Sequence, residues 1–145
     1  MTPATRIGAV SLVAGLLLVP GFVTPGSAGA AVGPGVEAGS GTTAMPDQVL
    51  RRGCHSYAYT YSLVPGGDDW ILETFLLDPG RQRVASNVYT SDTEPKSGSG
   101  VFSFCRNVTR FGTFKIRAKL TTYSGYDSST AWITPSYVRL HRWGK

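Results

Sequence analysis

The sequence has few of the residues from which catalytic and metal sites are usually built. Its 145 residues include two histidines, His55 and His141, and two cysteines. Histidine is the side chain that most readily exchanges protons near neutral pH, and these two lie far apart in the sequence. Two cysteines and two distant histidines lack the spacing of a structural zinc site, and no G-x-S-x-G nucleophile elbow is present. We therefore predict no catalytic residue, no metal and no cofactor.

Acidic residues are also scarce, and most of them fall in predicted turns. Glu73 is the only acid inside a predicted strand, so it is the one carboxylate to test as a general acid or base. Five others, in predicted turns and loops, could supply oxygen ligands for calcium at one end of the fold, but no D-x-D-x-D-G loop is present. We expect these acids, and Asp127, to be solvated turn residues. The five are Asp68, Asp69, Asp78, Asp92 and Glu94.

No hydrophobic run is long enough for a membrane span. Ile7–Val19 is apolar, but Pro20 ends the run well short of the roughly 20 residues that a spanning helix needs. With Arg6 before it and an A-x-A site at Ala28–Ala30 after it, this segment predicts a secretory signal peptide, residues 1–30. No cysteine lies near the predicted cleavage point, which excludes a lipid-modified terminus. We predict a secreted, extracellular protein with no membrane span after cleavage.

Both cysteines, Cys54 and Cys105, lie after the predicted cleavage point. An even number of cysteines in a short secreted chain indicates a disulfide rather than free thiols. In the chain-entropy model a loop of this length contributes about 4 kcal/mol, a large share of the ~5–15 kcal/mol that is typical of a domain. We predict one disulfide, Cys54–Cys105.

Basic residues are concentrated near the end of the chain. Residues 106–145 contain eight lysines or arginines and only one acid, Asp127. Such asymmetry can mark a surface for polyanions. The simpler interpretation is that Lys115, Arg117 and Lys119 form the solvated face of one strand. Because the basic residues lack the dense clustering of nucleic-acid grooves, we predict no nucleic-acid partner.

Strand patterns begin near residue 48 and continue to the end of the chain. Residues 31–47 are rich in small residues without a hydrophobic period, which predicts a flexible leader. From 48 to 145, short alternating segments without a helical period predict an all-β, two-sheet antiparallel β-sandwich of about seven strands. Residues 90–100 contain no apolar side chain and are expected to form a surface loop. The expected strands are 55–64, 70–77, 82–89, 101–105, 113–122, and two last segments, 130–134 and 137–142, divided by Pro135.

Three groups of β-sandwich proteins resemble parts of this pattern. The order Cys54, Trp70, Cys105 is similar to that of immunoglobulin domains, although Ser103 replaces the corner tyrosine of that family and more strands follow the second cysteine. The chain also resembles small exported β-sandwich proteins of high-GC Gram-positive bacteria. A third set of segments is Asp68-Asp69-Trp70, Leu77-Asp78-Pro79-Gly80, Val84-Ala85-Ser86 and Gly112-Thr113-Phe114-Lys115-Ile116. These segments resemble those of pre-peptidase C-terminal modules, and the resemblance implies an accessory, non-catalytic module that sometimes binds calcium.

Aromatic side chains are the remaining candidates for a binding site, since they stack on sugar rings. Tyr57, Tyr59 and Tyr61 alternate along one strand and form either half of the core or an exposed platform. Four other aromatic residues flank a turn or lie near the end of the chain: Tyr126, Trp143, Tyr123 and Trp132. The resulting hypothesis is a secreted, non-catalytic module that binds a carbohydrate or cell-envelope polymer. The alternative is a module that binds or inhibits another secreted protein.

Overall fold

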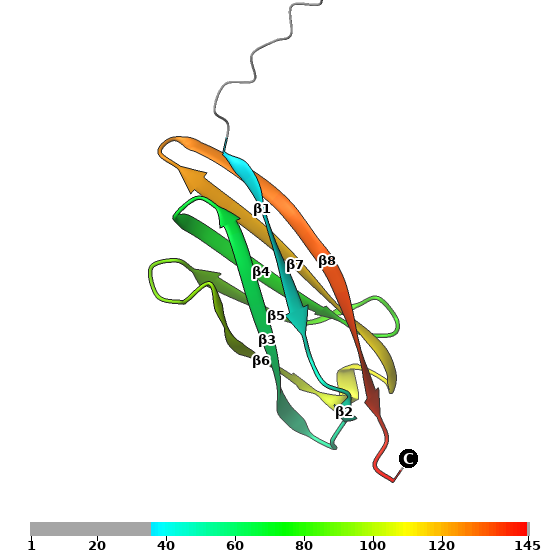
Figure 1. The fold of residues 1–145 in the computed structure, drawn as a ribbon. Coiled ribbons are helices and arrows are strands. Elements are labelled where there is room, and N and C mark those ends of the chain that lie inside the picture. Colours follow the sequence, from blue (N-terminus) through cyan, green and yellow to red (C-terminus); the bar gives the residue numbers. More distant parts are fainter. Residues whose placement is uncertain (1–35, 145) are drawn as a thin grey trace, which may run out of the picture. The chain divides into compact units, whose positions relative to one another are not determined.

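The computed structural model describes residues 36–144, and it confirms the all-β prediction (Figure 1). The described residues form eight strands and one short 3₁₀ helix, η1 (Arg106–Val108). The predicted signal peptide, and residues 31–35 of the predicted leader, lie outside the described residues. The strands are β1 (Glu37–Ala44), β2 (Gln48–Val49), β3 (Cys54–Gly66), β4 (Asp69–Leu77), β5 (Arg83–Thr90), β6 (Ser97–Cys105), β7 (Gly112–Ser124) and β8 (Asp127–His141).

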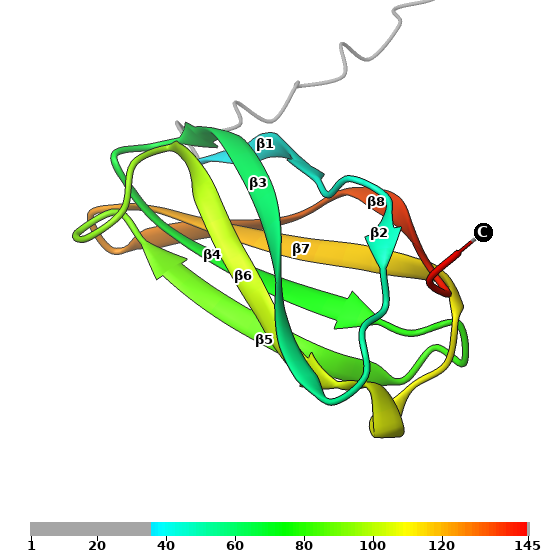
Figure 2. The same cartoon turned by 90° about the horizontal axis from the view of Figure 1, so that it is seen from below.

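The strands form two layers, as the sequence predicts (Figure 2). One sheet has three strands in the order β1-β3-β6, and the other has five in the order β2-β8-β7-β4-β5. Neighbouring strands run antiparallel except β2 and β8, which pair in parallel over two residues. Alternate side chains of each strand point into the space between the layers, where they form the core.

The tyrosine row of β3 belongs to this core. Tyr57, Tyr59 and Tyr61 are each at most 3% exposed, so they offer no platform to a ligand. Two of their rings stack on aromatic side chains of β6: Tyr59 on Phe102 with centroids 4.2 Å apart, and Tyr57 on Phe104 at 4.7 Å. The Tyr61 ring lies 4.9 Å from the ring of Tyr89 on β5.

The domain begins earlier than the sequence pattern predicts. We expected a flexible leader over 31–47, but residues 37–44 are strand β1, which pairs with β3. The inward positions of β1 include Gly39 and Gly41. Because glycine has no side chain, these positions give no alternating hydrophobic pattern in the sequence. A Cβ at Gly39 would lie 2.6 Å from Leu120 of the other sheet, and one at Gly41 would lie 2.6 Å from the Ser62 carbonyl oxygen of β3. Glycine is therefore needed because atoms of β3 and of the opposite sheet leave no room for a side chain.

A similar cause explains a second correction, in the predicted loop 90–100. Its last four residues, 97–100, are part of β6 and pair with β3. The inward positions are Gly98 and Gly100, and both lie beneath tyrosine rings. A Cβ at Gly98 would lie 2.8 Å from the Tyr61 hydroxyl, and one at Gly100 would collide with Tyr89. The apolar side chains that cover this part of the strand come from its neighbours.

The last two predicted strands are one strand, β8, and Pro135 lies inside it. Thr134 and Pro135 together occupy the place opposite one residue of β7, Arg117, because the register shifts between Ile133 and Ser136. This is a β-bulge, where the missing N–H of proline costs no ladder hydrogen bond. β2 pairs only with the end of β8. At the bulge, the side of β8 that faces away from β7 is therefore an edge of the five-stranded sheet.

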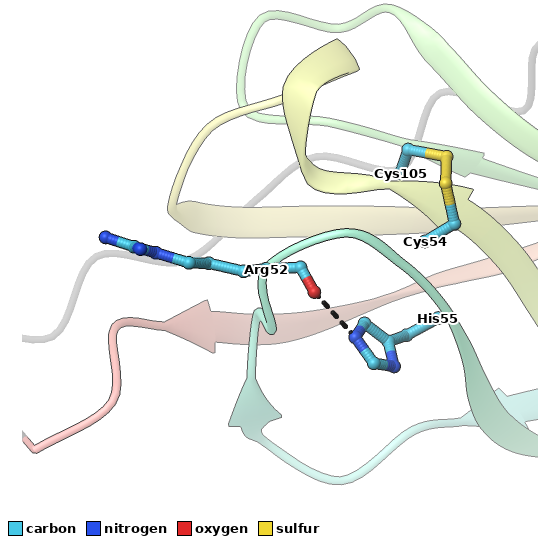
Figure 3. Close-up of a disulfide and its surroundings, with 4 residues drawn as sticks. All are labelled: Arg52, Cys54, His55 and Cys105. Atoms are coloured by element: carbon cyan, nitrogen blue, oxygen red, sulfur yellow. Dashed lines mark hydrogen bonds between the residues drawn. A yellow bond between two sulfur atoms is a disulfide. The ribbon is translucent and has the colours of Figure 1, made fainter.

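The predicted disulfide is present, but it does not have the immunoglobulin arrangement. Cys54 and Cys105 lie opposite each other on the adjacent strands β3 and β6 of one sheet (Figure 3). In immunoglobulin domains the bridge joins the two sheets and a tryptophan packs on it. Here Trp70 is buried in a different cluster with Tyr61 and other residues. The similarity in spacing therefore does not extend to the core.

Candidate functional site

The outer faces of the two sheets differ in chemistry. On the three-stranded sheet, outward positions carry serine hydroxyls that pair across the strands, Ser56 with Ser103 at 2.7 Å and Ser62 with Ser97 at 2.9 Å. The outer face of the five-stranded sheet instead carries aromatic and basic side chains on β4, β5, β7 and β8. We call this second surface the aromatic face. It consists of Phe75, Trp132 and Tyr137 with Arg83, Lys115 and Arg117.

The bulge in β8 decides which aromatic residues share this face. Trp132 and Tyr137 are five positions apart, so on a regular strand they would point to opposite sides of the sheet. The extra residue at the bulge shifts the alternation of β8 by one position, so that the two side chains face the same side of the sheet. Trp132 pairs with Lys119 and Tyr137 pairs with Lys115. Both aromatic side chains therefore point outward, with 55% and 63% of their surface exposed.

Cationic groups lie against each aromatic ring of this face. The guanidinium carbon of Arg117 is 4.1 Å from the Trp132 ring centroid, and that of Arg83 is 5.7 Å from the Phe75 centroid. The Lys115 ammonium lies 5.7 Å from Tyr137. Such contacts hold the long basic side chains down on the sheet at a gain of about 0.5–1 kcal/mol each at exposed sites.

The aromatic face is hollowed beside Trp132. A depression of about 440 Å³ is lined by Phe75, Leu77, Arg83, Arg117 and Trp132. The Phe75 and Trp132 rings are 6.3 Å apart, with a tilt of 47°. The depression is therefore an apolar floor between two arginines, which suits a flat ligand with acidic or hydroxyl groups at its edges.

Two carboxylates lie close to this face: Asp78, which lines a hollow with Lys115, Arg117 and Tyr137, and Glu73. Glu73 forms an ion pair with Lys119 at the side of Trp132. Each partner is about one-third exposed, so the pair adds little stability, but it cancels both charges locally. The charges of Arg83, Lys115 and Arg117 remain, and they make the face positive.

The four aromatic residues predicted as ligand-binding candidates do not form one site. Trp132 lies in the middle of the aromatic face. Tyr123 is 37% exposed at the end of β7, on the same outer side. Tyr126 is fully exposed in the turn before β8, where Gly125 adopts a φ of 59°. Trp143 is 81% exposed beyond the opposite end of β8, so the strand separates it from Tyr126.

Two members of the face, Phe75 and Tyr137, were missed by the sequence patterns. The β4 segment is apolar on both sides, which indicates a central strand but not which apolar residues remain accessible. Phe75 is only half-buried on the outer side. Tyr137 was missed because Pro135 suggested a break between two strands. The structure has a bulge in place of this break, and only the bulge places Tyr137 on the same side of the sheet as Trp132.

Of the residues considered for catalysis or calcium binding, His55 and Asp78 are engaged in local structure. The remaining turn and loop acids are exposed, as predicted: Asp68, Asp69, Asp92, Glu94 and Asp127. His55 Nε2 lies 2.7 Å from the Arg52 carbonyl oxygen and donates to it (Figure 3). Asp78 is buried at the β4–β5 turn. Its carboxylate accepts from the Gln82 N–H at 3.0 Å and the Thr109 hydroxyl at 3.1 Å. Within residues 36–144, no three of His, Cys, Asp or Glu gather as a metal-binding group, and no helix is long and apolar enough to cross a membrane.

A buried polar cluster joins the two sheets beneath the aromatic face. The Tyr59 hydroxyl lies 2.7 Å from the Thr74 hydroxyl and donates to the Tyr89 hydroxyl at 2.9 Å. Asn87 donates to Tyr59 and to the Val101 carbonyl. Burial raises the pKa of Tyr89 far above its ordinary value.

Comparison with known proteins leaves the family open. No protein-family model and no curated protein sequence matches this chain. Among solved structures, the chain is similar to the CARDB domain of a Pyrococcus furiosus protein, crystallised in complex with di-metal ions. The identity is 12%, the TM-score is 0.33, and the match covers 70% of this chain and 85% of that one. The function proposed below therefore depends on the residues of this chain.

Proposed function

We propose that this protein is a secreted, non-catalytic binding module that holds a carbohydrate polymer of the cell envelope on its aromatic face. The observation that carries the proposal is the exposure of Trp132 and Tyr137 beside Phe75 on one side of a rigid sheet. Aromatic rings with an exposed flat face bury large apolar area against sugar rings and lose little conformational entropy.

The charge of the face favours a polymer with acidic groups. Arg83, Lys115 and Arg117 are held over the aromatic rings, so their charged ends surround any ring stacked there. Guanidinium groups bind carboxylates and phosphates with two parallel hydrogen bonds. A polymer of sugars with acidic substituents would use both parts of the face at once.

Two features support the other parts of the proposal. The signal-peptide pattern and the disulfide suit a protein that works outside the cell. The acids nearest the face are occupied, Glu73 by Lys119 and Asp78 by its turn. A binding role needs neither of them to exchange protons with a substrate.

Retention on protein-free bacterial cell walls tests this function. We expect the secreted protein to be retained, and Trp132→Ala to lower its affinity about tenfold, the effect of losing ~1.4 kcal/mol of contact energy. Tyr137→Ala should act in the same direction. Tyr126→Ala is the matched control, because it removes an exposed aromatic ring outside the face and should leave retention unchanged.

The alternative function has its own outcome in this experiment. Equal retention of Trp132→Ala, Tyr126→Ala and the unchanged protein would overturn the proposal. Retention only on walls that still carry their proteins, and its loss after protease treatment of those walls, would favour a protein partner. Unchanged thermal unfolding of each variant would show that the fold is intact.

A further inference from the structure

A second basic surface lies at the disulfide end of the molecule, beyond the aromatic face. Arg51 and Arg52 lie in the connection between β2 and β3, Arg106 begins η1, and Arg142 follows β8. With Trp143 they line one hollow of about 500 Å³. We call this hollow the arginine pocket. Segments distant in the sequence thus bring four permanently charged groups to one place.

Backbone contacts fix the segments that carry these arginines. The Leu50 N–H donates to the His141 carbonyl oxygen at 2.9 Å, and the Arg106 N–H donates to the Gly53 carbonyl oxygen at 2.9 Å. The Arg51 N–H donates to the Tyr57 hydroxyl at 3.1 Å. Each bond joins two segments of the pocket wall or joins the wall to the core.

The disulfide and a histidine hold the same wall. Cys105 immediately precedes Arg106, so the bridge to Cys54 attaches η1 to β3. The hydrogen bond from His55 to the Arg52 carbonyl closes the turn before β3, and the Arg52 side chain extends away from the bridge (Figure 3). The pocket is therefore prepared before any ligand arrives, which lowers the entropy cost of binding.

One aromatic ring positions two of the guanidinium groups. The guanidinium carbon of Arg106 is 4.3 Å from the centroid of Phe111, and that of Arg142 is 5.2 Å from the same centroid. Two like charges are thus held near one ring. Among residues 36–144 the single ion pair joins Glu73 and Lys119, so no carboxylate of this part of the chain forms an ion pair with the arginines of the pocket.

We infer that the arginine pocket binds successive phosphate groups of an anionic polymer. Several guanidinium groups around one hollow match a ligand with repeated negative charge, and phosphate accepts the paired hydrogen bonds that guanidinium donates. The pocket has one exposed aromatic side chain, Trp143. Proteins that bind single-stranded nucleic acid stack successive bases on several aromatic side chains, so the observations favour a phosphate chain without bases.

Calorimetric titration with inorganic tripolyphosphate tests this inference, because the probe has phosphates but no sugar or base. We expect saturable binding that weakens as salt is added. The double variant Arg106→Gln/Arg142→Gln should lower the affinity about tenfold or more. Arg106→Lys/Arg142→Lys keeps the charge and loses the paired hydrogen bonds. Its affinity should therefore fall between that of the unchanged protein and that of the glutamine variant.

A control variant that removes the same number of charges distinguishes binding in the arginine pocket from general electrostatic attraction. Arg81→Gln/Lys96→Gln removes two charges outside the pocket and should leave tripolyphosphate affinity within about twofold. An equal loss in both glutamine variants, or no saturable binding, would overturn the inference. Tighter binding of a single-stranded oligonucleotide of the same charge, lost in Arg106→Gln/Arg142→Gln, would also overturn it. Trp132→Ala should leave tripolyphosphate affinity unchanged, so this site and the proposed sugar site can fail separately.

Discussion

At the scale of single residues, the most constrained side chains are the tyrosines between the sheets. Tyr59 contacts Thr74, Tyr89 and Asn87 through its hydroxyl, so one buried oxygen joins β3, β4 and β5. An unpaired hydroxyl in this position would carry the cost of desolvation. The polar groups of this cluster therefore satisfy one another's hydrogen bonds, and removing one group affects the hydrogen bonds of the others.

Tyr89 also links stability to alkaline pH. Its pKa is raised in the folded protein by burial. Below about pH 10 both the folded and unfolded forms keep the proton, so this group adds no pH dependence. Above that value the unfolded chain releases its proton first, and the free energy of unfolding falls as the pH rises.

We expect Tyr89→Phe to make this alkaline loss of stability shallower. At pH 7 the same change should lower the free energy of unfolding by about 1 kcal/mol, because Tyr59 loses a hydrogen-bond partner. Urea unfolding at a series of pH values between 7 and 11 measures both effects. Tyr126→Phe removes an exposed hydroxyl and is the control at pH 7. Identical slopes above pH 10 for Tyr89→Phe and the unchanged protein would contradict the argument.

At the scale of elements, the sequence predicts strands best where large side chains alternate with polar ones. In β7, Phe114, Ile116 and Leu120 are buried between basic residues, and the strand was predicted within two residues at each end. In β1 and the first half of β6 most inward residues are glycines, such as Gly39 and Gly98. Hydrophobic alternation cannot reveal a strand whose core side chains come from its neighbours.

The aromatic face depends on an element that sequence alternation does not show. The bulge at Thr134–Pro135 changes the inward positions of β8 from odd to even numbers: Ile133 is buried before it and Val138 after it. Trp132 was a sequence candidate by composition, whereas its partnership with Tyr137 requires the bulge. The site could therefore be predicted only in part.

Deletion of Pro135 tests this account of β8. Removing the extra residue makes the pairing with β7 regular and leaves Ile133 and Val138 facing inward, so the free energy of unfolding should change by about 1 kcal/mol or less. Deleting Thr121 from β7 is the matched control. β7 is paired on both sides at that position, and a one-residue slip there turns core side chains toward solvent.

Thermal unfolding and near-ultraviolet circular dichroism of the two deletion variants measure the difference. We expect the Pro135 deletion to unfold cooperatively and the Thr121 deletion to have lost its fixed aromatic signals. Similar damage in both would show that the bulge is not the feature that keeps the two faces in register.

At the scale of the whole molecule, β1 adds a second connection between the two layers. It pairs with β3 in the three-stranded sheet, and its Thr43 hydroxyl lies 2.7 Å from the Ser136 hydroxyl of β8 in the other sheet. Without β1, the β3 edge would be open. A domain that begins at residue 48, as the sequence pattern indicates, would lack this connection.

Truncation and one substitution test the role of β1 together. A chain starting at residue 48 should lose at least about 3 kcal/mol relative to one starting at residue 31, because Leu63, Leu120 and Ile133 lose their cover. Gly39→Val should destabilise the longer chain, since its side chain would collide with Leu120. Ser40→Val, on the exposed side of β1, should be tolerated. Urea unfolding compares the four proteins, and equal stability of the two chain lengths would mean that β1 covers the core without contributing to its stability.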